Sequence, residues 1–486
     1  MRKQLKALLM TVALVTLSTG LIGCNNEKKQ QQTTTQVETT ENKVENNIEF
    51  KSDGEPVKDD SVLGKNTYVF SPTDNKDEIQ EKVSQIFARQ ESNQFGDERY
   101  ALLFKPGDYG TSLEINVGFY TQVLGLGILP TDTNINKLWV NADWMFHNAT
   151  CNFWRSAENF SVNDYCMWAN SQAVSLRRVN FNDGIVLSDG EGWSSGGFMA
   201  DCKVEKMVSS GSQQQYLFRN NNWGYFENGV WNMVFAGVNV DTIPTGGWPY
   251  EPYTKEETVP KIQEKPYLVY DEDNGYGVMV PEKRTECQGI SWENGVKGTF
   301  YSLNMFYVAD AQKDNADTIN KALKEGKNLL LTPGIYTLDK PITVEEKDTI
   351  IYGMGLATLV STNGNACMVT SDADGIKVCG VLFEAGDKQS ETLLKVGNEK
   401  AEVSHSDNPI CFSDVYFRVG GANYKGKVKN CVTINSNDVI GDNFWVWRAD
   451  HGDNVGWDMN TAPNGIVING DNVTMYGLFV EHFQEY

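Results

Sequence analysis

The sequence predicts an all-β protein built from two tandem right-handed parallel β-helix domains, the second of them incomplete. Three observations support this fold class. The opening of one domain is repeated later in the chain. Short β-rich runs with Asn, Asp and Gly at their corners recur with a unit of roughly 20–35 residues, which is typical of a solenoid. Four segments of the C-terminal half share one pattern of apolar and polar positions.

The N-terminal residues have the pattern of an export signal. A basic start precedes an apolar stretch over residues 7–19 that is too short to span a bilayer. The letters LIGC at 21–24 resemble a bacterial lipobox, in which Cys24 becomes the lipidated N-terminus. We therefore expect a signal peptide over 1–23 and an exported lipoprotein, facing the cell surface or the periplasm and anchored at Cys24. The alternative is an ordinary signal peptide with a coincidental cysteine.

Residues 24–65 are predicted to form a disordered tether. They are rich in Gln, Thr, Asn, Lys and Glu, and they hold too few large apolar residues to offset the entropy of folding. The folded body is then divided into an N-terminal β-helix domain over 66–290 and a truncated C-terminal β-helix domain over 291–486. After the leader, no 18 consecutive residues are apolar, so the lipid is the expected contact with the membrane.

An internal duplication marks the start of each domain. In both copies a helical stretch leads into a strand and then into the pattern PGxY, at residues 106–109 and again at 333–336. A second strand and a Gly-x-Gly corner follow, at 125–127 and 353–355. Neither Gly-x-Gly precedes a helix, so neither reads as a dinucleotide motif. The opening resembles that of pectate-lyase-like β-helix domains. Residues 241–300 are rich in proline and are expected to form a connector that wraps the surface.

Composition narrows the class of partner. The formal net charge of −22 argues against nucleic acid and acidic lipid, and it disfavours a polyanionic polysaccharide. Twelve Trp and 20 Tyr residues suit neutral sugars, although core packing is the commoner use of such side chains. With four His residues and no HExxH or CxxC pattern, no metal and no cofactor are expected. The eight cysteines after Cys24 are expected mainly as small core residues, with disulfides left open.

The four aligned segments of the second domain predict a column of side chains. Each segment has apolar residues at its second and fourth positions, which should point inward, and its third and fifth positions should point outward. Equivalent positions of successive coils stack at ~4.8 Å. The fifth positions are Glu384, Arg418, Trp447 and Glu481. The third positions are Leu382, Tyr416, Trp445 and Phe479.

An outward file of Arg, Trp and Glu has the chemistry of a sugar site. Indole rings offer a flat apolar face to pyranose C–H groups, and Arg and Glu offer directional hydrogen bonds. The alternative is a column stabilised by Glu–Arg pairing and cation–π stacking that binds no ligand. If the column faces solvent, Arg418, Trp445 and Trp447 are its candidate sugar contacts.

Two long motifs carry a family resemblance. They are the segment from Asp438 to Tyr486 and the sequence SGSQQQYLFRNNNWG that ends at Gly224. Over roughly residues 66–486 the chain resembles bacterial exo-β-1,3-glucanases of glycoside hydrolase family 55. The resemblance implies two β-helix domains side by side, an active site in the cleft between them, a neutral β-1,3-glucan substrate of the laminarin type, attack from chain ends and inversion of configuration.

The resemblance also implies roles for individual residues. Glu481 would orient or deprotonate the attacking water, and Gln213 or Gln215 would help to position it. These two glutamines lie two apart and should share one strand face. Trp447, Asp450 and His451 would contact the sugar. The alternative for the glutamines is a structural polar ladder.

One departure from the family pattern qualifies the expected activity. In the family the general-acid glutamate lies on the order of 20 residues beyond the position of Glu481, one coil further on. The sequence stops at Tyr486, so we expect a fragment or a natural truncation that lacks the proton donor. Two rival functions stay open: a non-catalytic glycan-binding surface lipoprotein, and a polysaccharide lyase on the same fold. A monomer is expected.

Overall fold

The computed structural model describes residues 46–485 except 400 and 402. The predicted signal peptide, the lipidation site Cys24 and the first part of the predicted tether lie outside these residues. Almost all regular structure is β, and most strand pairs are parallel. No helix in the described part of the chain is both long and apolar enough to cross a bilayer.

The end of the predicted tether is folded, which corrects the prediction of disorder up to residue 65. Asn47–Lys51 form β1, which pairs in parallel with a strand of the connector. A 3₁₀ helix follows at Asp60–Leu63, and Leu63 is fully buried. Single apolar residues between 48 and 63 pack against the core, but polar residues separate them. The average composition of the segment is therefore polar and gave no sign that it folds.

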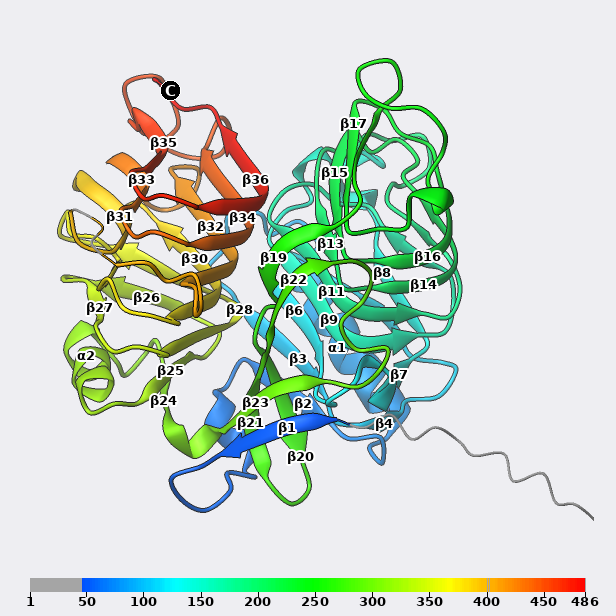
Figure 1. The fold of residues 1–486 in the computed structure, drawn as a ribbon, viewed down its shortest axis with the longest axis horizontal. Helices are drawn as coiled ribbons and strands as arrows, with labels where there is room; N and C mark the ends of the chain where they lie inside the picture. Colours follow the sequence, from blue (N-terminus) through cyan, green and yellow to red (C-terminus); the bar gives the residue numbers. More distant parts are fainter. Residues whose placement is uncertain (1–45, 400, 402, 486) are drawn as a thin grey trace, which may run out of the picture. The chain divides into compact units, whose positions relative to one another are not determined.

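The first stack of strands is one parallel 17-stranded sheet that folds back on itself (Figure 1). Helix α1 (Lys76–Gln90) lies beside β5. The strands are β2 (Thr67–Phe70), β3 (Tyr100–Phe104), β4 (Gly107–Asp108), β5 (Glu114–Asn116), β6 (Thr121–Gly125), β7 (Thr133–Ile135), β8 (Lys137–Val140), β9 (Arg155–Val162), β10 (Cys166–Trp168), β11 (Val174–Phe181), β12 (Ile185–Val186), β13 (Phe198–Ala200), β14 (Lys203–Ser209), β15 (Gln215–Arg219), β16 (Asn222–Glu227), β17 (Asn232–Ala236) and β18 (Tyr253–Glu256).

The second stack has two parallel sheets. One runs in the order β24-β25-β28-β30-β32-β34-β36, with β26 beside β28, and the other runs β27-β29-β31-β33-β35. Helix α2 (Ala316–Lys324) covers the start of this stack. The strands are β24 (Phe306–Ala309), β25 (Asn328–Leu331), β26 (Ile335–Leu338), β27 (Ile342–Val344), β28 (Ile350–Ser361), β29 (Met368–Thr370), β30 (Lys377–Glu384), β31 (Ser390–Val396), β32 (Cys411–Val419), β33 (Val428–Ile434), β34 (Ile440–Arg448), β35 (Asn464–Ile468) and β36 (Thr474–Glu481).

The two stacks open in the same way, as the duplication predicted. Both helices have an Asn N-cap, Asn75 and Asn315, whose side chain accepts bonds from two backbone N–H groups. The PGxY tyrosines are buried and equivalent. Tyr109 Oη donates to the carbonyl of Phe70, at the end of β2, at 2.7 Å. Tyr336 Oη donates to the carbonyl of Ala309, at the end of β24, at 2.8 Å. The two domain openings therefore share equivalent hydrogen bonds as well as similar sequences.

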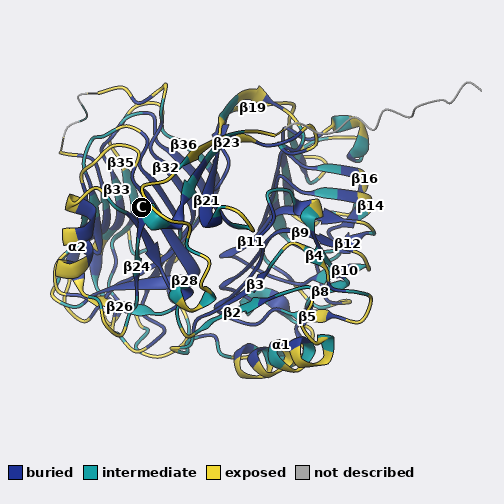
Figure 2. Ribbon diagram, turned by 90° about the horizontal axis from the view of Figure 1, so that it is seen from below, coloured by how far each residue is buried: buried dark blue, intermediate teal, exposed yellow. Residues whose placement is uncertain are grey.

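The connector is more than a surface wrap. It forms a hairpin-like pair, β19 (Val259–Gln263) with β22 (Lys283–Cys287), and a second sheet of β20 (Tyr267–Asp271), β21 (Gly275–Pro281), β23 (Lys297–Ser302) and β1. Leu268 and Val278 are fully buried in a cluster that also holds Leu124 of the first stack and Tyr352 of the second. The connector thus contributes to the core between the stacks, where Figure 2 shows mostly buried ribbon.

A buried ion-pair network joins the stacks through their polar side chains. Its cations are Arg177, Arg219 and Lys265, and its anions are Glu158, Glu264, Asp414 and Asp442. Arg177 of β11 contacts Asp414 and Asp442 of the second stack at 2.8 and 2.6 Å. Burial alone would raise the pKa of Asp414, but the cations, chiefly Arg177, hold it well below its usual range.

Candidate active site

The predicted register of the second stack is confirmed. Glu384 pairs with Arg418, Arg418 with Trp447, and Trp447 with Glu481, on β30, β32, β34 and β36. The predicted in–out alternation also holds. The second and fourth positions of the first three segments fill the core of the stack, whereas the third and fifth positions point away from it.

The column does not face solvent, which corrects the expectation of an open sugar-binding face. Arg418 is 1% exposed. Its Nη2 donates to Glu384 Oε2 at 2.8 Å, and its Nη1 donates to Tyr120 Oη of the first stack. The first stack covers this part of the column, because Tyr120 and Trp154 pack against it. Arg418 is therefore placed as a buried ion-pair partner, and no sugar can reach it in this arrangement.

The two tryptophans of the column lie in an aromatic cluster between the stacks. Trp445 and Trp447 are each 1% exposed, and their rings stack at a centroid distance of 4.6 Å. Phe153 and Trp154 of the first stack lie 4.6 and 4.8 Å from the Trp445 ring. Both indoles are thus buried against protein, so the prediction of open sugar-stacking faces is corrected at these positions.

Glu481 is the column member at the end of this cluster, and it is partly accessible. Trp445 Nε1 donates to its Oε2 at 2.7 Å, and Gln172 Nε2 of the first stack donates to its Oε1 at 2.9 Å. Burial raises the pKa of Glu481, and the hydrogen bonds from Trp445 and Gln172 act in the opposite direction. The carboxylate is therefore held by both stacks and is poised to take up a proton more readily than an exposed glutamate.

The first-stack partner of Glu481 is Gln172, not the predicted Gln213 or Gln215. Gln213 is fully buried and braces the backbone: its Oε1 accepts from Gly196 N and its Nε2 donates to the Asn170 carbonyl. Gln213 forms an isolated parallel bridge with Ser194 directly before β15, and Gln215 begins β15. A Cβ placed on Gly196 would lie 3.3 Å from Gln172 Cγ, so Gln213 supports the neighbourhood of Gln172 through this glycine.

The sequence offered no sign of Gln172. It lies in the short loop between β10 and β11, outside both repeated patterns and both family motifs. Only the meeting of this loop with β36 gives the residue a role.

Asp450 and His451 form a hydrogen-bonded pair beside the site. His451 Nδ1 lies 2.7 Å from Asp450 Oδ1, and Gln94 and Cys151 of the first stack face the other ring nitrogen. The hydrogen bond with Asp450, followed by that with Cys151, raises the pKa of His451 to about 9. The same bond lowers the pKa of Asp450, which is exposed. Asp450 is therefore ionised at neutral pH and unsuited to donate a proton.

Comparison with known proteins identifies the family of the chain. Residues 306–486 match the family described as LAM55 pectate lyase-like domain. Over 430 residues the chain is 47% identical to an exo-beta-1,3-glucanase from Streptomyces sp. (strain SirexAA-E / ActE), covering 87% of this chain and 70% of that enzyme. The chain belongs to the Lam55A-like family of glycoside hydrolases.

Solved structures of that family have the same fold. The structure of sacteLam55A from Streptomyces sp. SirexAA-E superposes with a TM-score of 0.85 at 46% identity, covering 87% of this chain and 77% of that one. A variant of sacteLam55A in complex with glucose gives the same TM-score and identity, covering 89% and 78%. The family resemblance predicted from the two motifs is therefore confirmed, and so is its enzyme class.

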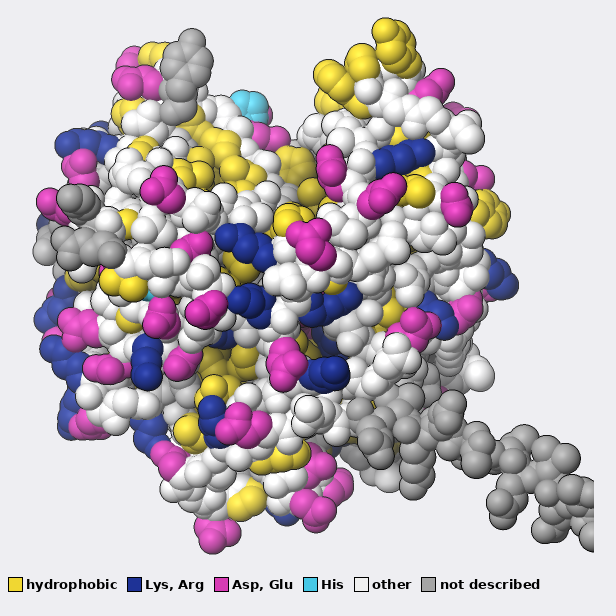
Figure 3. Space-filling view, in the orientation of Figure 1, with side chains coloured by type: hydrophobic (Ala, Val, Ile, Leu, Met, Phe, Trp, Pro, Cys, Tyr) yellow, Lys and Arg dark blue, Asp and Glu magenta, His cyan; other side chains and the backbone are white. Residues whose placement is uncertain are grey.

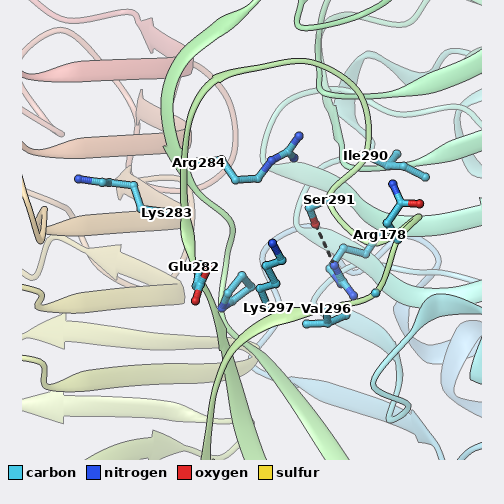
Figure 4. A pocket seen from close by; sticks show the side chains of 11 residues that line it. Arg178, Glu282, Lys283, Arg284, Ile290, Ser291, Val296 and Lys297 are labelled. Atoms are coloured by element: carbon cyan, nitrogen blue, oxygen red, sulfur yellow. Dashed lines mark hydrogen bonds between the residues drawn. The ribbon is translucent and has the colours of Figure 1, made fainter. Parts of the chain in front are cut away.

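One cavity of this glycoside hydrolase lies apart from Glu481. A pocket of about 350 Å³ beside the connector is lined by Arg178, Arg284, Ser291 and Lys297 among others (Figure 4). Arg178 is already bonded to Asp201 and Ser291. The pocket contains none of the predicted site residues, so it has no part in the assignment of the active site.

Potential metal ligands meet at one place in the described part of the chain. Ligand atoms of Asp143, His147 and Asp189 lie within 4.8 Å of one another. Asp189 Oδ2 also accepts from Ala142 N at 2.9 Å, and His147 is exposed. These contacts give the cluster a structural use in tying two loops together.

Proposed function

We propose that the chain hydrolyses β-1,3-glucan from chain ends with inversion of configuration. The observation that carries the proposal is the position of Glu481, which receives Trp445 Nε1 from its own stack and Gln172 Nε2 from the other. The 47% identity to an exo-beta-1,3-glucanase supports the substrate class. The substrate is a neutral polysaccharide, in keeping with a net charge of −22, and the reaction needs no cofactor.

In the proposed reaction Glu481 and Gln172 hold the attacking water. Inversion requires one carboxyl group to activate water and a second to protonate the leaving oxygen. A carboxylate with a raised pKa is a stronger base, so Glu481 suits the first role. Gln172 Nε2 donates to one oxygen of Glu481, and the side-chain oxygen of the same Gln172 amide can accept a hydrogen bond from the water. The leaving oxygen must take its proton from a second acid. Asp450, with its lowered pKa, keeps His451 protonated beside the site and does not serve as that acid, so the proposal assigns the donor role to none of the described residues around Glu481 and expects slow turnover where solvent water alone supplies the proton.

We infer that the two stacks are tandem right-handed parallel β-helices, supported by their parallel pairing and by the equivalence of Tyr109 and Tyr336. We also infer that the protein is exported as a monomer and held at the membrane through lipid on Cys24, supported by the lipobox-like sequence.

The test is hydrolysis of laminarin and of short laminari-oligosaccharides by wild type and by Glu481→Gln. Glucose release should fall about 10²–10⁴-fold in the variant, the range typical of a lost general base. The first product anomer, followed by NMR, should be the α form if the β linkage is inverted. An unsaturated product that absorbs in the ultraviolet would instead identify a lyase. Binding of laminarin without turnover would identify a glycan-binding protein.

A further inference from the structure

A pocket beside the connector collects positive charge on a strongly acidic protein. The pocket, of about 350 Å³, lies where β22 and β23 face β11 of the first stack (Figure 4). Its charged lining residues are Arg178, Lys283, Arg284 and Lys297, which are cationic, and Glu282. Figure 3 shows Lys and Arg side chains gathered near the centre of one face, where Figure 1 places β19 and β22. Because the formal net charge of the chain is −22, this local excess of cations indicates a ligand of opposite charge.

Two of these cations already have partners. Arg178 Nη1 donates to Asp201 Oδ2 at 3.2 Å, and the buried Asp201 carboxylate offsets its charge. Lys283 Nζ donates to the carbonyls of Ser406 and Asp407 of the second stack at 2.7 and 3.1 Å. Figure 4 shows the Lys283 side chain pointing away from the pocket. An anion in the pocket would therefore meet the other two cations, one from β22 and one from β23.

Arg284 of β22 has a donor that is not used. Its Nη2 donates to the carbonyls of Gln288 and Gly289 at 3.2 and 3.0 Å. Its Nη1 is buried and has no hydrogen-bond partner among the described residues. The charge of Arg284 acts on Glu264, but both oxygens of that carboxylate accept from Arg219 at 2.7 Å. A buried guanidinium N–H without an acceptor is costly, and an oxyanion in the pocket would supply the acceptor.

Lys297 brings a second charge to the same space. It begins β23 and is exposed, and its ammonium group forms no ion pair or hydrogen bond with the described part of the chain. Figure 4 shows it pointing from β23 toward Ser291, on the same side of the connector as Arg284. Glu282 is exposed as well, so water and salt weaken the charges of Glu282 and Lys297 alike. The half-buried Arg284 therefore sets the positive sign of the pocket.

The remaining walls of the pocket are partly apolar and partly polar. Ile290 and Val296 are buried apolar side chains, and Asn294 adds an exposed amide. A volume of about 350 Å³ lies at the lower end of the ~300–1,000 Å³ that is typical of small-molecule sites. Guanidinium groups bind carboxylate and phosphate oxygens with directional hydrogen bonds, and an ammonium group adds a point charge. The lining therefore fits a small oxyanion.

An ion between Arg284 and Lys297 would bridge the two sheets of the connector. Arg284 lies on β22, which pairs with β19, whereas Lys297 lies on β23, which pairs with β21 and β1. The connector contacts both stacks, since Lys283 bonds to the second stack and Tyr267 Oη accepts from Arg178 of the first at 3.2 Å. A ligand that links the two sheets would therefore stabilise the joint between the stacks.

We propose that this pocket binds a small oxyanion with two or more negative charges, held between Arg284 and Lys297. The charge is carried by phosphate or by the carboxylates of a small organic acid, because both offer oxygen acceptors to a guanidinium and an ammonium group. The bound ion stabilises the connector and, through it, the folded body. The pocket contains none of the residues around Glu481, so the inference goes beyond the proposed function and does not depend on it.

The test measures the binding of inorganic phosphate and of citrate to the full chain by calorimetry. It also compares the thermal midpoint in each salt with that in sodium chloride at equal ionic strength. One variant, Arg284→Gln/Lys297→Gln, removes both charges, and a second, Lys297→Gln, changes only an exposed side chain and should leave the fold intact. The matched control is Lys347→Gln/Lys425→Gln, which removes two exposed positive charges from the second stack, outside the pocket.

We expect phosphate, citrate or both to bind wild type and to raise its thermal midpoint above that in chloride, because a ligand that binds only the folded state stabilises it. Lys297→Gln should weaken binding about tenfold and the double variant about 100-fold, since a hydrogen bond to a charged group is typically worth about tenfold in affinity. The control should match wild type. Binding of phosphate alone would identify a site for phosphoryl groups, and binding of citrate alone a site for carboxylates. Turnover of laminarin should be the same in all folded variants.

Three results would overturn the proposal. The first is a wild type that binds neither phosphate nor citrate. The second is an equal rise of the thermal midpoint in wild type and in the folded double variant, because the anions would then act on the protein as a whole. The third covers a double variant that does not fold: unchanged affinity in Lys297→Gln would then show that the ion is not held in this pocket.

Discussion

Replacement of Asp442 by Asn should weaken the joint between the two stacks. Asp442 is fully buried on β34 and receives Arg177 Nη1 at 2.6 Å, Arg219 Nε at 3.0 Å and Arg219 Nη2 at 2.8 Å. The side chain of Asn has the same shape but no charge. Its amide would also place one NH₂ group against a guanidinium, so at least one of these donors would lose its acceptor.

The size of the effect follows from the partners that remain. Breaking a buried ion pair by removing one member typically costs ~3–5 kcal/mol. Here Arg177 keeps Asp414, and Arg219 keeps Glu264 through two bonds at 2.7 Å. Neither cation is left without a carboxylate, so we expect the lower end, ~3 kcal/mol in the free energy of unfolding. That value corresponds to about a 100-fold fall in the ratio of folded to unfolded protein.

Urea unfolding of wild type and Asp442→Asn measures this difference, with Asp273→Asn as the control. Asp273 is exposed in the turn between β20 and β21, and its replacement should change the free energy of unfolding by less than ~0.5 kcal/mol. A double-variant cycle with Arg219→Gln should show strong non-additivity, because the two side chains share hydrogen bonds. A loss under ~1 kcal/mol for Asp442→Asn, or simple additivity in the cycle, would show that the network does not hold the stacks together.

Three further predictions concern the neighbourhood of Glu481. Trp445→Phe removes a 2.7 Å hydrogen bond that lowers the pKa of Glu481. Burial already raises this pKa above the ordinary glutamate value of 4.5, so the acid limb of the pH profile of kcat/KM should move to still higher pH in the variant. An acid limb that does not move would show that Glu481 does not control it. His451 has a pKa raised from 6.5 to about 9, so its contribution to stability is complete below pH 6.5 and is lost as the pH rises through about 9. His451→Gln should therefore make the free energy of unfolding depend less steeply on pH in that window. An unchanged dependence of the unfolding free energy on pH would contradict the assignment. Trp447→Ala should lower the free energy of unfolding by ~3–5 kcal/mol, because it leaves a cavity at a buried position beside Phe95 and Trp445. A variant that is as stable as wild type but binds laminarin more weakly would support the original expectation that Trp447 contacts the sugar.

Local regularities were readable from the sequence. The column Glu384–Arg418–Trp447–Glu481 could be aligned because a β-strand alternates its side chains with a period of two and because parallel coils repeat the pattern. The equivalence of Tyr109 and Tyr336 could be anticipated from PGxY. Disorder up to residue 65 was wrong because average composition hides single anchoring residues such as Leu63, which is fully buried.

The sequence by itself determined the strand period, the register of the column, the repeated opening and the family. Only the tertiary structure decided which faces are covered. It buried Arg418 and Trp447 against the first stack, and it brought Gln172, rather than Gln213 or Gln215, to Glu481. The physical reason is that strand periodicity specifies which way a side chain points relative to its own coil. What it then meets depends on contacts between residues some 300 positions apart, such as Gln172 and Glu481, and no local pattern encodes them.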